Sequence, residues 1–186
     1  MPELRFPDPP LADEVVALRP WQTEDVPTKV MAFAHPSILR YSWPRLTPYT
    51  EQDARDFFDA QEQASRRGEE LQFALVAPGD PGAVLGGGSV YGIDPGHGRA
   101  AVGYWLAPAA RGRGVATHAT RLMAGWAFAA LGIARLELTC GPDNERSQRV
   151  AQRCGFVREG VLRSHMPFQG ARRDSVMFSL LPGELR

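Results

Sequence analysis

The sequence lacks an excess of charge of either sign. Its 186 residues contain 21 Lys and Arg against 21 Asp and Glu, so the formal net charge at pH 7 is zero. Proteins that bind nucleic acid or anionic membranes through their overall charge need a basic excess. We therefore expect neither nucleic acid nor a membrane among the partners of this chain.

Cysteine is scarce as well, since only Cys140 and Cys154 are present. They lack the paired spacing of a zinc site and are too few for a disulfide framework, so we expect no metal and two reduced thiols. Long apolar runs are also missing. The N-terminus has no signal-peptide core, and no stretch approaches the roughly 20 apolar residues of a membrane span. These absences predict a soluble, cytoplasmic protein.

The composition that is present suits one globular domain. Hydrophobic residues make up 44% of the chain and charged residues 23%, a balance typical of folded proteins. A chain of this length is expected to form a single domain around one core. Residues 1–13 are rich in Pro and Asp and are predicted to form a loose N-terminal arm, ahead of a domain at residues 14–182.

The front half of the chain is dominated by strand patterns. Ahead of most of them, residues 35–49 contain three prolines and are expected to form a loop. The strand patterns then follow one another with only short turns between them, which favours an antiparallel meander. We expect these strands at residues 71–77, 84–91 and 100–107.

The second half alternates helices and strands. After Val115, apolar residues recur at intervals of three and four, which predicts a long helix that ends at Gly132. A strand, a second helix and a final hairpin are expected at residues 133–140, 144–153 and 156–180. The whole order predicts an α+β fold, a single domain whose mixed, mostly antiparallel central sheet is flanked by helices.

A basic, glycine-rich loop precedes the long helix, with the sequence Arg-Gly-Arg-Gly-Val-Ala at residues 111–116. The start of a helix binds anions, because it presents unpaired N–H groups and the positive end of the helix dipole. Gly112 and Gly114 let the backbone approach a ligand closely. Arg111 and Arg113 add forked donors that suit phosphate. The loop is therefore predicted to bind phosphate groups.

Two other phosphate-binding loops do not match this segment. The P-loop requires Gly-x-x-x-x-Gly-Lys-Ser/Thr, which is absent. A dinucleotide-binding loop requires a third small residue where this chain has Thr117, and it belongs to a parallel strand–helix unit, whereas here a meander comes first. On the loop alone, a glycine-rich turn without any ligand stays open.

The loop is one of several motifs in a fixed order. The others are Gly-Tyr-Trp-Leu at 103–106, Pro-Asp-Asn-x-x-Ser at 142–147, Gly-Phe at 155–156 and Glu-Gly at 159–160. Together they resemble the GNAT superfamily of acetyltransferases. More narrowly, they resemble the RimJ/RimL type, whose named members acetylate N-termini of ribosomal proteins. The resemblance covers nearly the whole chain.

The resemblance implies the GNAT fold, in which the fourth and fifth strands splay apart, and an acyl-CoA-dependent N-acyltransferase. Such an enzyme transfers an acetyl group from acetyl-CoA directly to a primary amine, either a protein N-terminus or a small molecule. Two alternatives stay open. One is a larger donor such as succinyl-CoA, for which Arg163 or Arg172 would supply positive charge, and the other is a non-catalytic CoA-binding module. A homodimer is also left open.

The resemblance also assigns the donor site. The pantetheine arm of acetyl-CoA is expected between the splayed strands, and its pyrophosphate at the start of the long helix. Asn144 is implied to bind the pantetheine arm, although helix capping also explains Asn144 and Ser147. Arg149 and Arg153 are expected to face either the adenosine end or solvent. The implied cofactor-binding residues are Trp105, Leu106, Ala107, Arg111, Gly112, Arg113, Gly114, Val115, Ala116, Thr117, Asn144 and Ser147.

Catalysis requires a proton donor for the departing thiolate and a base for the amine. Ser147 is the implied proton donor. Many relatives carry an acid just before the residue that is Gly103 here, and this chain does not. Glu137, Asp174 and His165 therefore stand as alternative bases.

The acceptor is expected to enter from the side opposite the pyrophosphate. Large aromatic side chains suit the walls of a binding pocket. Tyr41, Trp43 and Phe168 are therefore expected to line the acceptor site, with packing inside a lid as the alternative.

Overall fold

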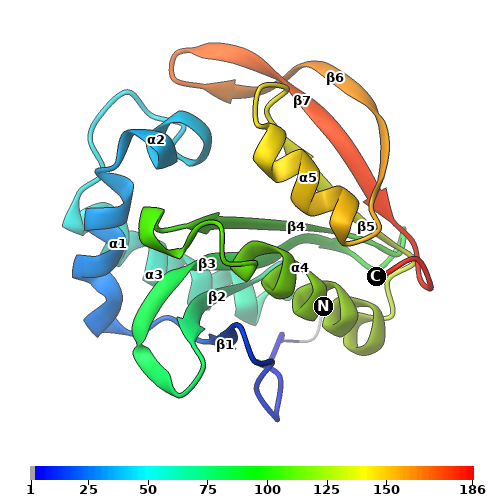
Figure 1. Cartoon of the computed structure of the whole chain (residues 1–186), viewed down its shortest axis with the longest axis horizontal. Helices are drawn as coiled ribbons and strands as arrows, with labels where there is room; N and C mark the ends of the chain where they lie inside the picture. The colour runs from blue at the N-terminus through cyan, green and yellow to red at the C-terminus, as the bar shows by residue number, and fades with distance from the viewer. Residues whose placement is uncertain (1–2) are drawn as a thin grey trace.

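The computed structural model describes residues 3–186, so Met1 and Pro2 of the expected arm lie outside the described residues. One seven-stranded sheet forms its centre, in the order β1-β2-β3-β4-β5-β7-β6 (Figure 1). Every neighbouring pair is antiparallel except β4 and β5, which are parallel. The strands are β1 (Ala17–Arg19), β2 (Glu70–Ala77), β3 (Asp80–Asp94), β4 (Arg99–Leu106), β5 (Arg135–Cys140), β6 (Val157–Phe168) and β7 (Ala171–Leu180).

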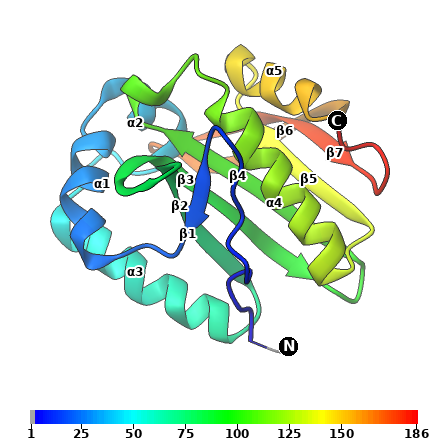
Figure 2. The same cartoon turned by 60° about the horizontal axis from the view of Figure 1, so that its bottom comes forward.

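Helices cover both faces of the sheet (Figure 2). The main core lies between the sheet and the pair α4 and α5, and a smaller cluster around Trp21 lies on the opposite face, beneath α3. None of the helices within residues 3–186 has the length and apolarity that a membrane crossing requires. The helices are α1 (Val26–Phe33), α2 (Pro36–Ser42), α3 (Glu51–Arg66), α4 (Val115–Leu131) and α5 (Glu145–Arg153), with 3-10 turns at Thr23–Asp25 and Pro108–Ala110.

Alternation along the strands explains the two layers. In β2, Phe73 and Leu75 face the main core, whereas Ala74 and Val76 face the cluster on the other side. This period of two is a property of extended backbone, and it places every second side chain on the same face. The α+β fold with one mixed sheet, predicted from the order of patterns, is confirmed.

The sheet divides between β4 and β5. Their parallel pairing runs only from Arg99 with Arg135 to Ala101 with Glu137. Beyond that point β4 stays paired to β3 as far as Leu106, while β5 stays paired to β7. β4 and β5 therefore separate after Ala101 and Glu137, because each strand stays paired only to its other neighbour. The expected splay of the fourth and fifth strands is present.

Two expectations about the front of the chain were wrong. Residues 35–49 are not only a loop, because α2 occupies seven of them. The N-terminal segment is not loose. Leu4 is buried and its N–H donates to the Ser65 carbonyl, while the Leu18 N–H donates to the Leu11 carbonyl. Burial of its apolar side chains holds the segment against α3 and β1, despite its prolines.

Candidate active site

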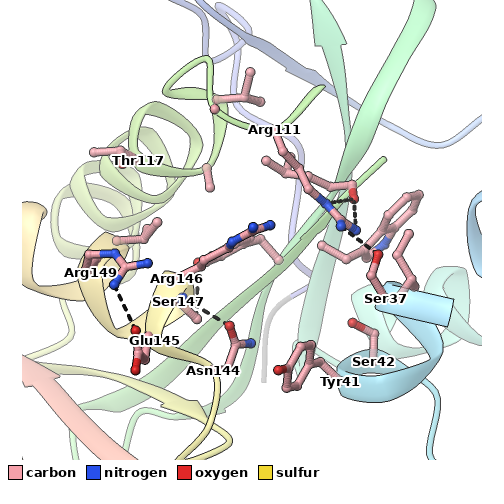
Figure 3. A pocket seen from close by; sticks show the side chains of 18 of the residues that line it. Ser37, Tyr41, Ser42, Arg111, Thr117, Asn144, Glu145, Arg146, Ser147 and Arg149 are labelled. Carbon is pink, nitrogen blue, oxygen red and sulfur yellow. Dashed lines mark hydrogen bonds and ion pairs between the residues drawn. The ribbon is translucent and has the colours of Figure 1, made fainter. Parts of the chain in front are cut away.

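A cleft of about 1070 Å³ opens between α2, α4 and α5, beside the part of β4 that β5 does not pair (Figure 3). All of the expected donor residues line it except Ala107 and Arg113. The Ala107 N–H points away, since it donates to the Leu85 carbonyl on the β3 side. Arg113 is exposed. The structure thus brings together residues from β4, the glycine loop and α5.

The glycine loop has a backbone that favours glycine. Gly112 has φ +77° and Gly114, the N-cap of α4, has φ +82°, a left-handed conformation that other residues rarely adopt. By position, the N–H groups of Val115 and Ala116 have no acceptor within the helix. The Thr117 N–H, in contrast, donates to the Gly114 carbonyl at 2.9 Å. The anion-binding part of the helix start is therefore narrower than the sequence suggested.

Two guanidinium groups face this helix start. Arg111 donates to the Leu106 carbonyl and to Ser37 Oγ, the latter at 2.6 Å. From α5, Arg146 extends across the cleft toward Arg111 (Figure 3). Burial lowers the pKa of Arg111, and the charge of Arg146 lowers it further. The facing positive charges of Arg111 and Arg146 favour the binding of an anion between them.

Arg146 was missed by the sequence reasoning, which considered only Arg149 and Arg153 on this helix. All three line the cleft. Their positions differ by three and by four residues, so they share one face of α5. The spacing of the three arginines could therefore have pointed to Arg146 from the sequence. Arg149 also donates to Glu145 at 3.2 Å, so part of its charge is already compensated.

Ser147 lies within reach of both β4 and β5. Tyr104 donates its hydroxyl hydrogen to Ser147 Oγ at 3.1 Å, and burial raises the pKa of Tyr104. Because Ser147 Oγ accepts that hydrogen bond, its own hydrogen points to another group. Burial raises the pKa of the Cys140 thiol, and a hydrogen bond with Ser147 lowers it. Asn144 caps α5 through its side-chain oxygen, which accepts from the Ser147 N–H at 3.2 Å. The capping role is therefore present, and the amide nitrogen of Asn144 stays free for a ligand.

The three alternative bases lie apart. Asp174 accepts the Ser164 N–H at 2.7 Å and so stabilises a residue with φ +53° in the β6–β7 hairpin. His165 is exposed and bonds Ser175 Oγ at 3.0 Å. None of the three candidate bases lines the cleft. Glu137 lies directly opposite Ala101, at the last paired position before β4 and β5 separate. Of the three, only Glu137 adjoins the splay.

A second carboxylate on the Glu137 face was also missed. Glu70 lies opposite Tyr91, Tyr91 opposite Ala101, and Ala101 opposite Glu137, which makes one row across four strands. Burial raises the pKa of both Glu70 and Tyr91. The Tyr91 ring leans over Gly103, where an added Cβ would lie 3.3 Å from the ring. A glycine at this position leaves room for that ring.

The three expected acceptor residues have different surroundings. Tyr41 lines the cleft, and its hydroxyl donates to Asp143 at 3.3 Å. Trp43 lies outside the lining and packs edge-on against Phe33 and Tyr49. Phe168 lies beneath the guanidinium of Arg173, 3.8 Å from its carbon. Packing, the alternative interpretation, is what the structure shows for Trp43.

The tip of the β6–β7 hairpin is attached to the α2 region. The Gln169 side chain donates to the carbonyls of Leu39 and Trp43 at 3.1 and 3.2 Å, and its N–H donates to the Pro44 carbonyl. These bonds join segments far apart in the sequence. All three hydrogen bonds come from one residue, so Gln169 alone holds the hairpin tip against the α2 region.

The site as a whole suits a long, anionic donor molecule. One end offers a helix start and two facing arginines, and the other offers an unpaired strand edge and the hydroxyl of Ser147. Strand edges present N–H and C=O groups that can pair with amides. These features suit an enzyme that binds a phosphate-bearing acyl donor.

Comparison with known proteins identifies the family. Residues 16–157 match the acetyltransferase (GNAT) domain model. The N-acetyltransferase p20 of Bacillus licheniformis, itself uncharacterized, is 29% identical over 175 residues, 94% of this chain and 97% of its own. The ribosomal-protein-serine acetyltransferase of Escherichia coli is 27% identical, with 66% of each chain covered. Spermidine N(1)-acetyltransferase of the same organism is 26% identical over 87% of this chain and 83% of its own.

Solved structures share the fold. RimJ of Mycobacterium smegmatis, solved in complex with CoA-disulfide, superposes with a TM-score of 0.79 at 24% identity, over 91% of this chain and 83% of that one. A GNAT-family acetyltransferase of Bacillus anthracis gives 0.79 at 21% identity, over 92% and 97%. The chain belongs to the GNAT family of N-acetyltransferases, and its relatives include the RimJ/RimL type.

Proposed function

We propose that this enzyme transfers an acetyl group from acetyl-CoA to a primary amine of a protein N-terminus or a small molecule. The observation that supports it best is the separation of β4 from β5 beside the helix start of α4. The unpaired edge of β4 suits the pantetheine amides, and the loop with Arg111 and Arg146 suits the pyrophosphate. One relative is named as a ribosomal-protein-serine acetyltransferase and another as a spermidine N(1)-acetyltransferase, and spermidine is an amine.

The thioester supplies an activated acyl group, so no covalent intermediate on the protein is needed. Within this proposal, Ser147 donates its hydroxyl hydrogen to the departing thiolate, and Tyr104 supports it by donating to the same oxygen. Glu137 is proposed as the base because it adjoins the point where β4 and β5 separate. Cys140 and Cys154 are buried, and burial raises the pKa of both thiols, so neither is a ready nucleophile.

The type of amine decides how much the base must do. An α-amine has a pKa near 8, so roughly a tenth of it is neutral at pH 7, whereas a lysine near 10.4 is only about 0.04% neutral. The difference amounts to about 3–4 kcal/mol. The proposal therefore favours α-amines over lysine side chains, since an α-amine demands less of Glu137.

The test is a thiol-release assay with acetyl-CoA and three acceptor panels: peptides with free N-termini, small amines including polyamines, and lysine-containing peptides with blocked N-termini. We expect CoA release that depends on an amine, with transfer of the acetyl group to the amine confirmed by mass spectrometry. CoA binding without release across all three panels would show a binding module in place of an enzyme.

A further inference from the structure

One arginine near the reaction centre is held in place without an acidic partner. Arg173, on β7, lies between α2 and the hairpin tip, with its guanidinium stacked on the Phe168 ring at 3.8 Å. One terminal nitrogen donates to the Tyr41 carbonyl at 3.3 Å. Stacking on an aromatic face fixes the plane of the guanidinium and reduces the entropy lost when it binds a ligand.

The hydrogen-bonding capacity of Arg173 is largely unused. Its Nε is buried and has no partner, and among residues 3–186 no carboxylate forms an ion pair with it. The charge of Asp143 raises the pKa of Arg173, but the Asp143 carboxylate is bound by Arg40 at 2.6 Å and by the Tyr41 hydroxyl. A half-buried cation with an unpaired donor is unfavourable unless something supplies an acceptor.

The neighbouring Arg172, in contrast, is hydrogen-bonded within its own hairpin. Its Nε donates to the Ser164 carbonyl and hydroxyl, and a terminal nitrogen donates to the His165 carbonyl. Arg172 is exposed and its bonds fasten its own hairpin. It is therefore a structural arginine, whereas Arg173 stacks on Phe168 and donates to the carbonyl of Tyr41, a residue that lines the cleft.

Arg173 lies close to the proposed chemistry. Burial raises the pKa of the Cys140 thiol, a hydrogen bond with Ser147 lowers it, and the charge of Arg173 lowers it as well. Cys140 ends β5 on the far side of the splay from Tyr104, and Ser147 contacts both. Its hydrogen bond to the Tyr41 carbonyl also joins the guanidinium to a residue that lines the cleft.

We propose that Arg173 is a carboxylate-binding subsite beside the reaction centre, which selects a reaction partner that carries a carboxylate near the reacting group. The inference rests on the proposed function. A planar fork matches a carboxylate through two parallel hydrogen bonds. The carboxylate belongs either to the acceptor, as in an amino acid or an acidic N-terminal residue, or to the acyl chain of the donor, as in succinyl-CoA.

The experiment measures kcat/KM in two arms. In the first, acetyl-CoA is used with acceptors matched in size that carry either a carboxylate or the corresponding carboxamide. In the second, acetyl-CoA is compared with succinyl-CoA on an acceptor that has no carboxylate. We expect the wild-type enzyme to prefer the carboxylate-bearing partner in one arm by about 10- to 100-fold, which is the usual range for a charge-assisted pair.

Three variants test whether the preference for a carboxylate depends on Arg173. Arg173→Gln should abolish it while leaving the carboxylate-free reaction within about threefold of wild type. Arg173→Lys, which keeps the charge and loses the fork, should retain part of it. Arg172→Gln is the matched control and should keep the full preference. Circular dichroism and thermal melting check that each variant is folded.

The outcomes separate this inference from the proposed function. Equal rates in both arms, or an equal loss of both reactions in Arg173→Gln, overturn the subsite and leave the acetyltransferase activity standing. Absence of acyl transfer to every acceptor overturns the proposed function and the subsite with it. A preference that survives Arg173→Gln assigns the selectivity to another residue and also overturns the proposal.

Discussion

Two hydroxyl groups meet in the cleft, and their order of donation decides their roles. Tyr104 donates to Ser147 Oγ, so the hydrogen of Ser147 can be given to a leaving group. From the sequence, Ser147 could be proposed through the resemblance to GNAT enzymes, which implies a hydroxyl at this position. Tyr104 could not, because its role depends on β4 passing close to the first turn of α5, which is a tertiary contact.

Ser147→Ala is expected to lower kcat by about 100-fold, since it removes the proton donor for the thiolate. KM for acetyl-CoA should change by less than about threefold, because the residue acts mainly in the transition state. Tyr104→Phe should have a smaller effect in the same direction. Steady-state kinetics with varied acetyl-CoA separates the two parameters.

Ser42→Ala is the control for this pair of variants, because Ser42 also lines the cleft and belongs to α2. It should retain the wild-type kcat. A Ser147→Ala enzyme with unchanged kcat would remove the proton-donor role and leave Ser147 as a residue of the helix start alone.

At the scale of elements, some segments could be predicted from sequence and others could not. The α4 helix follows from apolar spacing and from Gly132, which ends it with φ +61°. The α2 helix was predicted as a loop because prolines usually interrupt helices. Here Pro36 occupies the first turn, where its missing N–H costs nothing, and His35 accepts the Ser37 N–H.

The glycine loop before α4 should be essential for donor binding. Gly114→Glu should abolish CoA binding, because it places bulk and negative charge at the start of α4, where the diphosphate is proposed to bind. Isothermal titration calorimetry with CoA measures the affinity directly. We expect a loss of at least about 100-fold, the effect of removing several charge-assisted contacts.

A control is needed because φ at Gly114 is positive and any side chain there strains the backbone. Gly79 has φ +77° in an open turn, with no atom within 4 Å of an added Cβ. Gly79→Glu therefore carries a similar backbone strain and the same added charge, away from the cleft. It should bind CoA as the wild type does, and if folded Gly114→Glu also does, the loop assignment is wrong.

At the scale of the whole molecule, the packing around Lys29 stands out. It is the single lysine of the sequence, 2% exposed, and its Nζ lies 2.9 Å from the centroid of Phe57 and 4.8 Å from that of Trp21. Burial lowers its pKa to about 6, against a raising effect of Glu70. Sequence patterns could not reveal this, because the rings around Lys29, which include Phe33, come from three separate segments.

The consequence is a dependence of stability on pH. Between the folded pKa of about 6 and the unfolded value of 10.5, the unfolded chain binds more protons at Lys29 than the folded one. The free energy of unfolding therefore rises with pH through this window, by up to about 1.4 kcal/mol per unit from this group. Lys29→Met should be more stable than wild type at pH 7 and should lose this slope.

Urea unfolding at a series of pH values from about 6 to 8 measures both quantities. Arg55→Met is the control, since it removes one positive charge from the exposed surface of α3. It should keep the wild-type slope. A Lys29→Met protein that is less stable at pH 7 and has an unchanged slope would show that the ammonium stays charged among the rings.

We propose that the cleft between α4 and α5 holds the acyl donor, with its thioester at Ser147. A crystal structure with bound CoA tests this arrangement. We expect the diphosphate at the N–H groups of Val115 and Ala116, between Arg111 and Arg146, with the pantetheine between β4 and β5 and its sulfur beside Ser147. CoA bound elsewhere on the molecule, or with its sulfur directed away from Ser147, would contradict it.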